Sequence, residues 1–165
     1  MRELEIEPIL DLCHFGMPDW LGNSFQNPEF PKAFAAYARA FAKRYRWVRF
    51  YTPVNEILVC AKFSALYGWW NEQERSDPAF VTAVKHLTKA TLLAMREILK
   101  VQPRAIFIQS ESSEYTRTVC HCEHTEERVS CQNQVRFIPL DLLYCHEVRA
   151  DIHAWLMDNG MAGRE

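Results

Sequence analysis

The chain alternates short strand-like segments with long helical patterns, and this alternation limits its fold more than any other feature. The helical patterns repeat apolar side chains at the spacing of an amphipathic helix. Connections of this length are typical of crossovers between parallel strands, because antiparallel strands can be joined by a short hairpin. The strand candidates are residues 8–13, 48–54 and 105–109, and the helical patterns are residues 30–45 and 78–102. The order predicts an α/β fold in which helices cover parallel strands.

Capping signals set the expected ends of the helices. Asp77 is expected as the N-cap of the second helix and Pro78 as its first residue. Pro103 should stop that helix, because proline cannot continue it. A further helix is expected from Leu140 to Met157, ending at Asn159-Gly160, which is a typical C-cap pair.

Composition favours one packed domain over residues 1–165. Hydrophobic residues make up 48% of the chain and aromatic residues 13%, which excludes a disordered or low-complexity segment. The formal net charge of -2 gives no electrostatic case for nucleic acid or an anionic membrane as a partner. No apolar run approaches the roughly 18 residues that a membrane span requires.

The cysteines are expected to be free thiols. The first residues, 1–5, lack the apolar core of a signal peptide, so we expect a cytoplasmic protein in which thiols stay reduced. Cys13, Cys60 and Cys145 lie in apolar or helical contexts and are expected to be small buried hydrophobes.

A stretch rich in cysteine and histidine is the candidate for a metal site. Cys120-His121-Cys122 is followed by His124 and Cys131. The Cys-x-Cys spacing is tighter than the spacing usual in zinc sites, and no second compact pair follows. We therefore expect a mobile loop with incidental thiols and no bound metal.

Polar side chains follow each of the three strand candidates. His14 follows the first, Asn55-Glu56 follows the second, and residues 109–111 follow the third. The carboxyl ends of parallel strands share one face, so we expect these groups to converge. A carboxylate beside an amide that can hold a hydroxyl suits general acid/base chemistry on a sugar.

Four segments together resemble a known family. They are Cys13 to Leu21, Tyr51 to Glu56, Gly68 to Glu72 and Asp141 to Tyr144. In these segments the chain resembles family 1 glycoside hydrolases, the β-glucosidase group. The resemblance implies a (β/α)₈ TIM barrel with retaining chemistry, and it identifies the three strand candidates with the third, fourth and fifth barrel strands.

The same resemblance implies roles for individual residues. Glu56 is expected to be the general acid/base, and Asn55 to hold the sugar 2-hydroxyl. His14 is expected to contact glycone hydroxyls, while Trp20 and Trp69 offer aromatic surfaces to sugar faces. A carbohydrate is thus the expected ligand, and this chemistry requires no cofactor.

The second carboxylate of a retaining site is missing from the sequence. In the family it belongs to a Thr/Ser-Glu-Asn-Gly motif that ends the seventh strand, and no such motif occurs here. Asp158-Asn159-Gly160 is similar only in part and is interpreted as a helix cap. Since a complete barrel needs about 250 residues, we expect a partial barrel with three strands at most.

Two other carboxylates are alternatives to a missing nucleophile. Glu111 and Glu114 could supply the second carboxylate, although the serines around them favour a polar loop.

Phe15 stands where most relatives have tryptophan, and Ile57 stands where proline commonly follows the acid/base residue. Both departures leave the substrate class open.

Three functions are therefore compatible with the sequence. The first is a β-glycosidase-like segment whose catalytic site is incomplete. The second is a non-catalytic protein that uses the strand ends to bind sugar or another partner. The third is a barrel fragment without a role of its own, whose open sheet edges lead to self-association.

Overall fold

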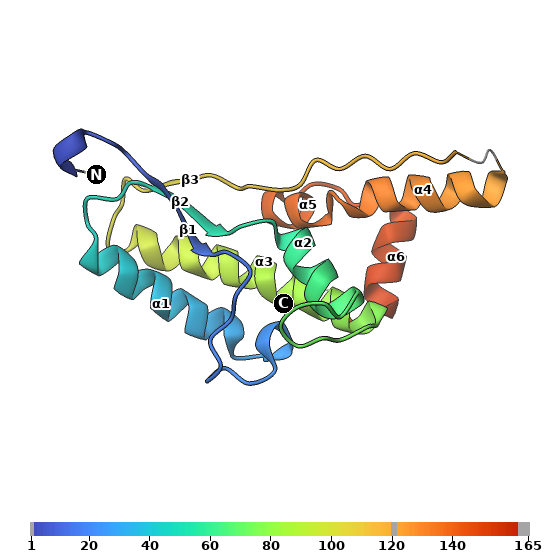
Figure 1. The fold of residues 1–165 in the computed structure, drawn as a ribbon, viewed down its shortest axis with the longest axis horizontal. Helices are drawn as coiled ribbons and strands as arrows, with labels where there is room; N and C mark the ends of the chain where they lie inside the picture. The colour runs from blue at the N-terminus through green and yellow to red at the C-terminus, as the bar shows by residue number, and fades with distance from the viewer. Residues whose placement is uncertain (1, 120–121, 162–165) are drawn as a thin grey trace.

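A small parallel sheet forms the centre of the fold. The computed structural model describes residues 2–119 and 122–161 (Figure 1). The strands β1 (Ile9–Cys13), β2 (Phe50–Val54) and β3 (Ile106–Phe107) pair in the order β1-β2-β3, and both pairings are parallel. The predicted parallel α/β arrangement is confirmed, but the third strand is shorter than the expected 105–109.

Two long helices cover one side of this sheet. α1 (Phe30–Arg44) and α3 (Asp77–Leu99) lie next to each other beneath the strands in Figure 1. Both place an apolar stripe in the core, where Ala38 and Leu87 are completely buried. Short 3₁₀ turns, η1 (Arg2–Leu4) and η2 (Ser24–Gln26), precede β1 and α1. The periodicity of the sequence located both long helices to within a few residues.

The N-cap of α3 differs from the prediction. Ser76 has an extended backbone and its side-chain oxygen accepts a hydrogen bond from the backbone N–H of Ala79 at 3.3 Å. Asp77 is instead the first helical residue, followed by Pro78. The cap therefore lies one residue before the expected one, because only an extended residue can aim its hydroxyl at the free amides of the first turn.

A helical connection follows β2 where the sequence predicted only an aromatic segment at residues 63–70. α2 (Ile57–Ala61) continues directly into the π-helical turn η3 (Lys62–Leu66). All five residues of α2 are buried. A fully apolar helix has no amphipathic stripe, so periodicity gave no signal for it.

The C-terminal part contains three helices. They are α4 (Glu123–Val135), α5 (Ile138–Tyr144) and α6 (Ala150–Asp158). The single helix expected over 140–157 is wrong, because Cys145 takes a left-handed conformation with φ 56° and ends α5. The predicted end at Asn159-Gly160 is confirmed, with Asn159 as C-cap and Gly160 at φ 101°.

Burial divides the cysteines. Cys13 and Cys60 are buried, as expected, whereas Cys145 is exposed and does not belong to the core. The break between α5 and α6 carries Cys145 to the surface. In the part of the chain that the structure describes, no helix is both long and apolar enough to cross a membrane.

Replacing the α3 cap should destabilise the fold. We expect Ser76→Ala to lower the free energy of unfolding by about 1 kcal/mol, the usual effect of losing an N-cap hydroxyl. Ser76→Asp keeps an acceptor at the same place and should preserve stability. Urea unfolding followed by circular dichroism measures both. Equal losses in the two variants would contradict the assignment of Ser76 as the cap.

Candidate active-site segment at the strand ends

Backbone hydrogen bonds join the residues that follow the three strands. The N–H of Asn55 donates to the carbonyl oxygen of Cys13 at 3.0 Å. The next N–H, that of Glu56, donates in the opposite direction to the carbonyl oxygen of Ser110 at 2.9 Å. The parallel ladder therefore continues past all three strands. This confirms that the polar residues after the strands share one edge of the sheet.

Glu56 occupies a sharp turn between β2 and α2. It is half-buried, and its backbone lies in the left-handed region with φ 47° and ψ 67°. Such a conformation costs a non-glycine residue roughly 1–2 kcal/mol. The bond from its N–H to Ser110 and a bond from the N–H of Cys60 to its carbonyl oxygen, 2.9 Å, hold it there. The turn presents the carboxylate at the end of the strand.

Asn55 and His14 flank this turn. Asn55 is only 7% exposed, and its carbonyl oxygen accepts a hydrogen bond from the Cys60 thiol at 3.3 Å. The His14 imidazole is exposed, with Nδ1 2.9 Å from Oδ2 of Asp11. Its ring packs edge-on against Phe15, with ring centroids 4.4 Å apart. Because Asp11 binds Nδ1, the other ring nitrogen of His14, Nε2, is available to a ligand.

Glu111 is a structural carboxylate. Its two oxygens accept hydrogen bonds from the backbone N–H groups of Ile57 and Leu58, at 3.0 and 3.3 Å. The side-chain amide of Gln109 donates to it as well, at 2.9 Å. Burial raises the pKa of the Glu111 carboxyl despite these donors, and the nearby charge of Glu56 contributes in the same direction.

The expected polar loop is confirmed, because Glu111 lies in an irregular segment, and its side chain in addition has a structural role. A carboxylate whose two oxygens bind the amides after Glu56 is not free to attack a sugar. It fixes the start of α2 and thereby the turn at Glu56. Glu114 is exposed and accepts a hydrogen bond from the Ser112 hydroxyl at 3.2 Å.

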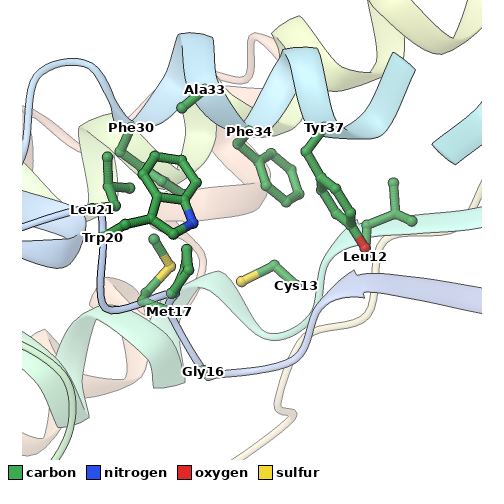
Figure 2. Close-up of a pocket in the computed structure, with 11 residues that line it drawn as sticks. Leu12, Cys13, Gly16, Met17, Trp20, Leu21, Phe30, Ala33, Phe34 and Tyr37 are labelled. Carbon is green, nitrogen blue, oxygen red and sulfur yellow. The ribbon is translucent and has the colours of Figure 1, made fainter. Parts of the chain in front are cut away.

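The two candidate tryptophans lie in different surroundings. Trp69 is 61% exposed and packs against Phe63 and Tyr67, with ring centroids 4.9 Å away in each case. Trp20 is 75% exposed and lies over an apolar cavity of about 330 Å³ between β1 and α1 (Figure 2). Neither Asn55 nor Glu56 lines that cavity. Trp20 therefore does not share this cavity with the acid/base candidate.

Sequence reasoning gave no role to Asn71, which ties two loops together. Its side-chain amide donates to the carbonyl oxygen of Phe15 at 3.0 Å and to the hydroxyl of Ser64 at 2.8 Å. Trp70 packs on the Phe15 ring at 4.9 Å, and Phe15 itself has a φ of 75°. The only signal in the sequence was that Asn71 belongs to a segment resembling the family.

The neighbouring Glu72 is also partly buried. One of its oxygens accepts a hydrogen bond from the side chain of Gln26 at 3.2 Å, and burial raises the pKa of its carboxyl. The other oxygen is buried without a hydrogen-bond partner. Glu72 thus links the loop after η3 to η2.

The cysteine-rich stretch is helical where the structure describes it. Cys120 and His121 lie outside the described residues. Cys122 is the N-cap of α4, and Cys131 lies within α4, so the expected loop is wrong there. Cys131 lies nine residues after Cys122, which corresponds to a rise of about 13 Å along the helix. The two residues are therefore too far apart to bind one metal ion. Within residues 2–119 and 122–161, no three metal-ligating side chains gather at one point.

Comparison with known proteins identifies the family. The sequence model of glycosyl hydrolase family 1 matches residues 1–143. The chain belongs to glycosyl hydrolase family 1. The resemblance found in the four sequence segments is thereby confirmed. No curated protein matches the chain.

Solved family 1 structures share the fold. A family 1 β-glucosidase from Thermotoga maritima superposes with a TM-score of 0.83 at 20% identity, over 96% of this chain and 37% of that one. Complexes of a Thermotoga maritima β-glucosidase with glucoimidazole and with deoxynojirimycin each give a TM-score of 0.80 at 20% identity. Each of these covers 96% of this chain and 39% of the other. The chain thus spans less than two fifths of these neighbours, and a partial barrel fits both comparisons.

Replacing Glu111 by glutamine should loosen the turn at Glu56. An amide has only one acceptor oxygen, so Glu111→Gln leaves one buried N–H unpaired, and we expect a loss of about 1–3 kcal/mol in unfolding free energy near pH 4. Glu114→Gln, on the exposed neighbouring carboxylate, should have little effect. Urea unfolding of both variants provides the comparison.

The loss in Glu111→Gln should shrink as pH rises. Because the Glu111 pKa is raised above its ordinary 4.5 in the folded protein, the folded state binds more protons than the unfolded state between these two values. Wild-type stability from this group is therefore complete below pH 4.5 and declines as pH rises through the folded pKa. A gap between wild type and variant that widens with pH would contradict this sign.

Proposed function

We propose that this chain is a β-glycosidase-like segment carrying the acid/base half of a site for β-linked sugars. Glu56 donates a proton to the leaving oxygen, Asn55 holds the 2-hydroxyl, and His14 contacts the glycone. The main support is the ladder that brings the ends of all three strands together through Cys13, Asn55, Glu56 and Ser110. A carboxylate, an amide and an imidazole thus belong to the carboxyl end of the sheet.

The chemistry assigned to Glu56 requires a proton donor that later becomes a base. General acid catalysis by a positioned carboxyl contributes roughly 10²–10⁴ in rate. The amide of Asn55 can donate to the 2-hydroxyl, a contact that strengthens as positive charge develops on the ring. The left-handed turn at Glu56 supports the role because it fixes the backbone from which the carboxylate projects.

The second half of a retaining site has no counterpart among these residues. A nucleophilic carboxylate would stand about 5–5.5 Å from the acid/base. Glu111, from the adjacent strand end, is occupied by the N–H groups of Ile57 and Leu58. This observation favours a second candidate, a non-catalytic protein that binds sugar at the strand ends. Trp20 and Trp69 remain candidate platforms for such a ligand.

Rates of glycoside hydrolysis should show that the chain lacks a nucleophilic carboxylate. With an aryl β-glucoside in water, we expect wild type to be no faster than Glu56→Gln. Added formate can replace the absent carboxylate, and hydrolysis of an aryl glucoside with a poor leaving group should then depend on Glu56. We expect Glu56→Gln to lower that rescued rate about 10²-fold or more, while Glu114→Gln leaves it unchanged.

Two results would change the assignment. Glu56-dependent turnover without formate would show that the chain contains a complete site. Rescued turnover that is identical in wild type and Glu56→Gln would remove the acid/base role from Glu56. Product formation is followed by release of the phenol.

Sugar binding tests the second candidate separately. We expect methyl β-glucoside to bind the wild-type chain, and His14→Ala to weaken binding about tenfold, the equivalent of one hydrogen bond. His153→Ala, an exposed histidine on α6, is the matched control. Calorimetry gives both affinities. Unchanged affinity in His14→Ala would exclude His14 from the binding surface.

A further inference from the structure

Phe15 has an unfavourable backbone conformation directly beside His14. Its φ of 75° lies in the left-handed region, where a bulky side chain is rarely found. Both of its backbone polar groups have partners. The side-chain amide of Asn71 donates to its carbonyl oxygen at 3.0 Å, and its N–H donates toward the buried thiols of Cys13 and Cys60. Such a conformation persists only where the surrounding contacts impose it. These contacts therefore shape the loop that carries His14.

The Phe15 ring connects the imidazole of His14 to the loop after η3. It packs edge-on against the imidazole, with ring centroids 4.4 Å apart. It also lies 4.9 Å from the ring of Trp70, which in turn packs on Phe63 of η3 at 4.6 Å. Aromatic pairs at these distances contribute stability beyond the apolar area that they bury. The imidazole therefore rests on a ring whose position is set from η3.

The loop that supplies Asn71 and Trp70 is itself fastened to η3. The carbonyl oxygen of Phe63 accepts hydrogen bonds from the N–H groups of Trp69 and Trp70, at 2.7 and 3.0 Å. The hydroxyl of Ser64, which is completely buried, accepts a hydrogen bond from the Asn71 amide at 2.8 Å. Asn71 has a φ of 43°, a conformation that asparagine tolerates better than most residues. Its amide thus spans from η3 to the loop of His14.

The turn η3 also continues the helix that begins after Glu56. α2 runs directly into η3, and the N–H of Cys60 in α2 donates to the carbonyl oxygen of Glu56 at 2.9 Å. The same helical connection therefore carries Glu56 at its start and Asn71 shortly after its end. Each of these contacts is formed between residues of the chain itself.

We propose that Asn71 is a positioning residue for His14. Through the carbonyl oxygen of Phe15 it holds the loop after β1 against η3, and it thereby fixes the imidazole relative to Glu56. This role rests on the proposed function, in which His14 contacts the glycone. Asn71 acts on the sugar only through His14, since the side-chain N–H groups of Asn71 bind Phe15 and Ser64.

Asn71→Asp tests the positioning directly. The substitution keeps the size of the side chain and its tolerance of a left-handed backbone, but it replaces the amide donor by an oxygen that repels the Phe15 carbonyl. In proton NMR spectra at neutral pH, we expect the nuclear Overhauser contacts between the rings of His14 and Phe15 to weaken at least several-fold. The ring-current shift of the His14 signals should shrink as well. His14→Ala identifies these signals among the six histidines.

Asn159→Asp is the matched control, because the side-chain amide of Asn159 also donates to a backbone carbonyl oxygen, that of Trp155, at 2.8 Å. Asn159 is the C-cap of α6, and its replacement should leave the His14 signals unchanged. Ser64→Ala is a second variant, since it removes the other partner of the Asn71 amide. It should change the His14 signals in the same direction by a smaller amount.

Circular dichroism shows which variants are folded. Unchanged His14 signals in folded Asn71→Asp would overturn the proposal. If that variant does not fold, unchanged signals in Ser64→Ala would overturn it instead. Failure of both variants to fold would mark Asn71 as a residue of the fold alone and would equally overturn the positioning role.

Sugar affinity separates positioning from a general loss of stability. We expect Asn71→Asp to weaken binding of methyl β-glucoside by up to about tenfold, since its effect passes through one hydrogen bond of His14. In a His14→Ala background the same substitution should cause no further loss, because both changes act on one contact. Calorimetry gives the affinities of wild type, the two single variants and the double variant. An equal loss in both backgrounds would contradict a role through His14.

The sugar site and the positioning role can fail separately. If methyl β-glucoside does not bind the wild-type chain, the proposed sugar site is wrong, and the NMR comparison still decides whether Asn71 positions His14. If the sugar binds and the His14 signals do not respond to Asn71→Asp, the proposed function stands and the positioning role is wrong.

Discussion

The candidate site depends on two backbone hydrogen bonds that extend the sheet past its strands. One joins Asn55 to Cys13 and the other joins Glu56 to Ser110. Because they come from consecutive amides that point in opposite directions, they hold Glu56 in the middle of the three strand ends. The carboxylate of Glu111 then binds the next two amides and starts α2. A left-handed turn that would be unfavourable alone is thus stabilised from both sides.

Hydrophobic patterning predicted those parts of the fold that have one buried face. α1 and α3 each show an apolar stripe, and β1 and β2 are short apolar runs bounded by turn residues. The patterning failed where this contrast is absent. α2 is buried on every side, and α4 is polar over most of its length, so neither has a period to detect. The break at Cys145 was missed because a left-handed cysteine has no sequence signature of the kind that glycine provides.

The site was predicted in outline but not in its supporting contacts. Parallel topology was enough to bring His14, Asn55 and Glu56 to one sheet edge, because residues after parallel strands share a face. The role of Glu111 was not predictable in this way. It depends on the direction of two amides in a helix that the sequence did not reveal. Trp20 lies over a cavity beside α1, a position that no sequence pattern indicated.

A partial barrel affects the turn at Glu56 and the outer strands β1 and β3 differently. The contacts around Glu56 are all made between strand ends present in this chain, so a closed barrel is not needed to shape the turn. Closure matters instead at β1 and β3, where Ile9 and Ile106 are exposed and where a complete barrel would supply paired strands. The acid/base half of the site therefore requires only neighbouring strands.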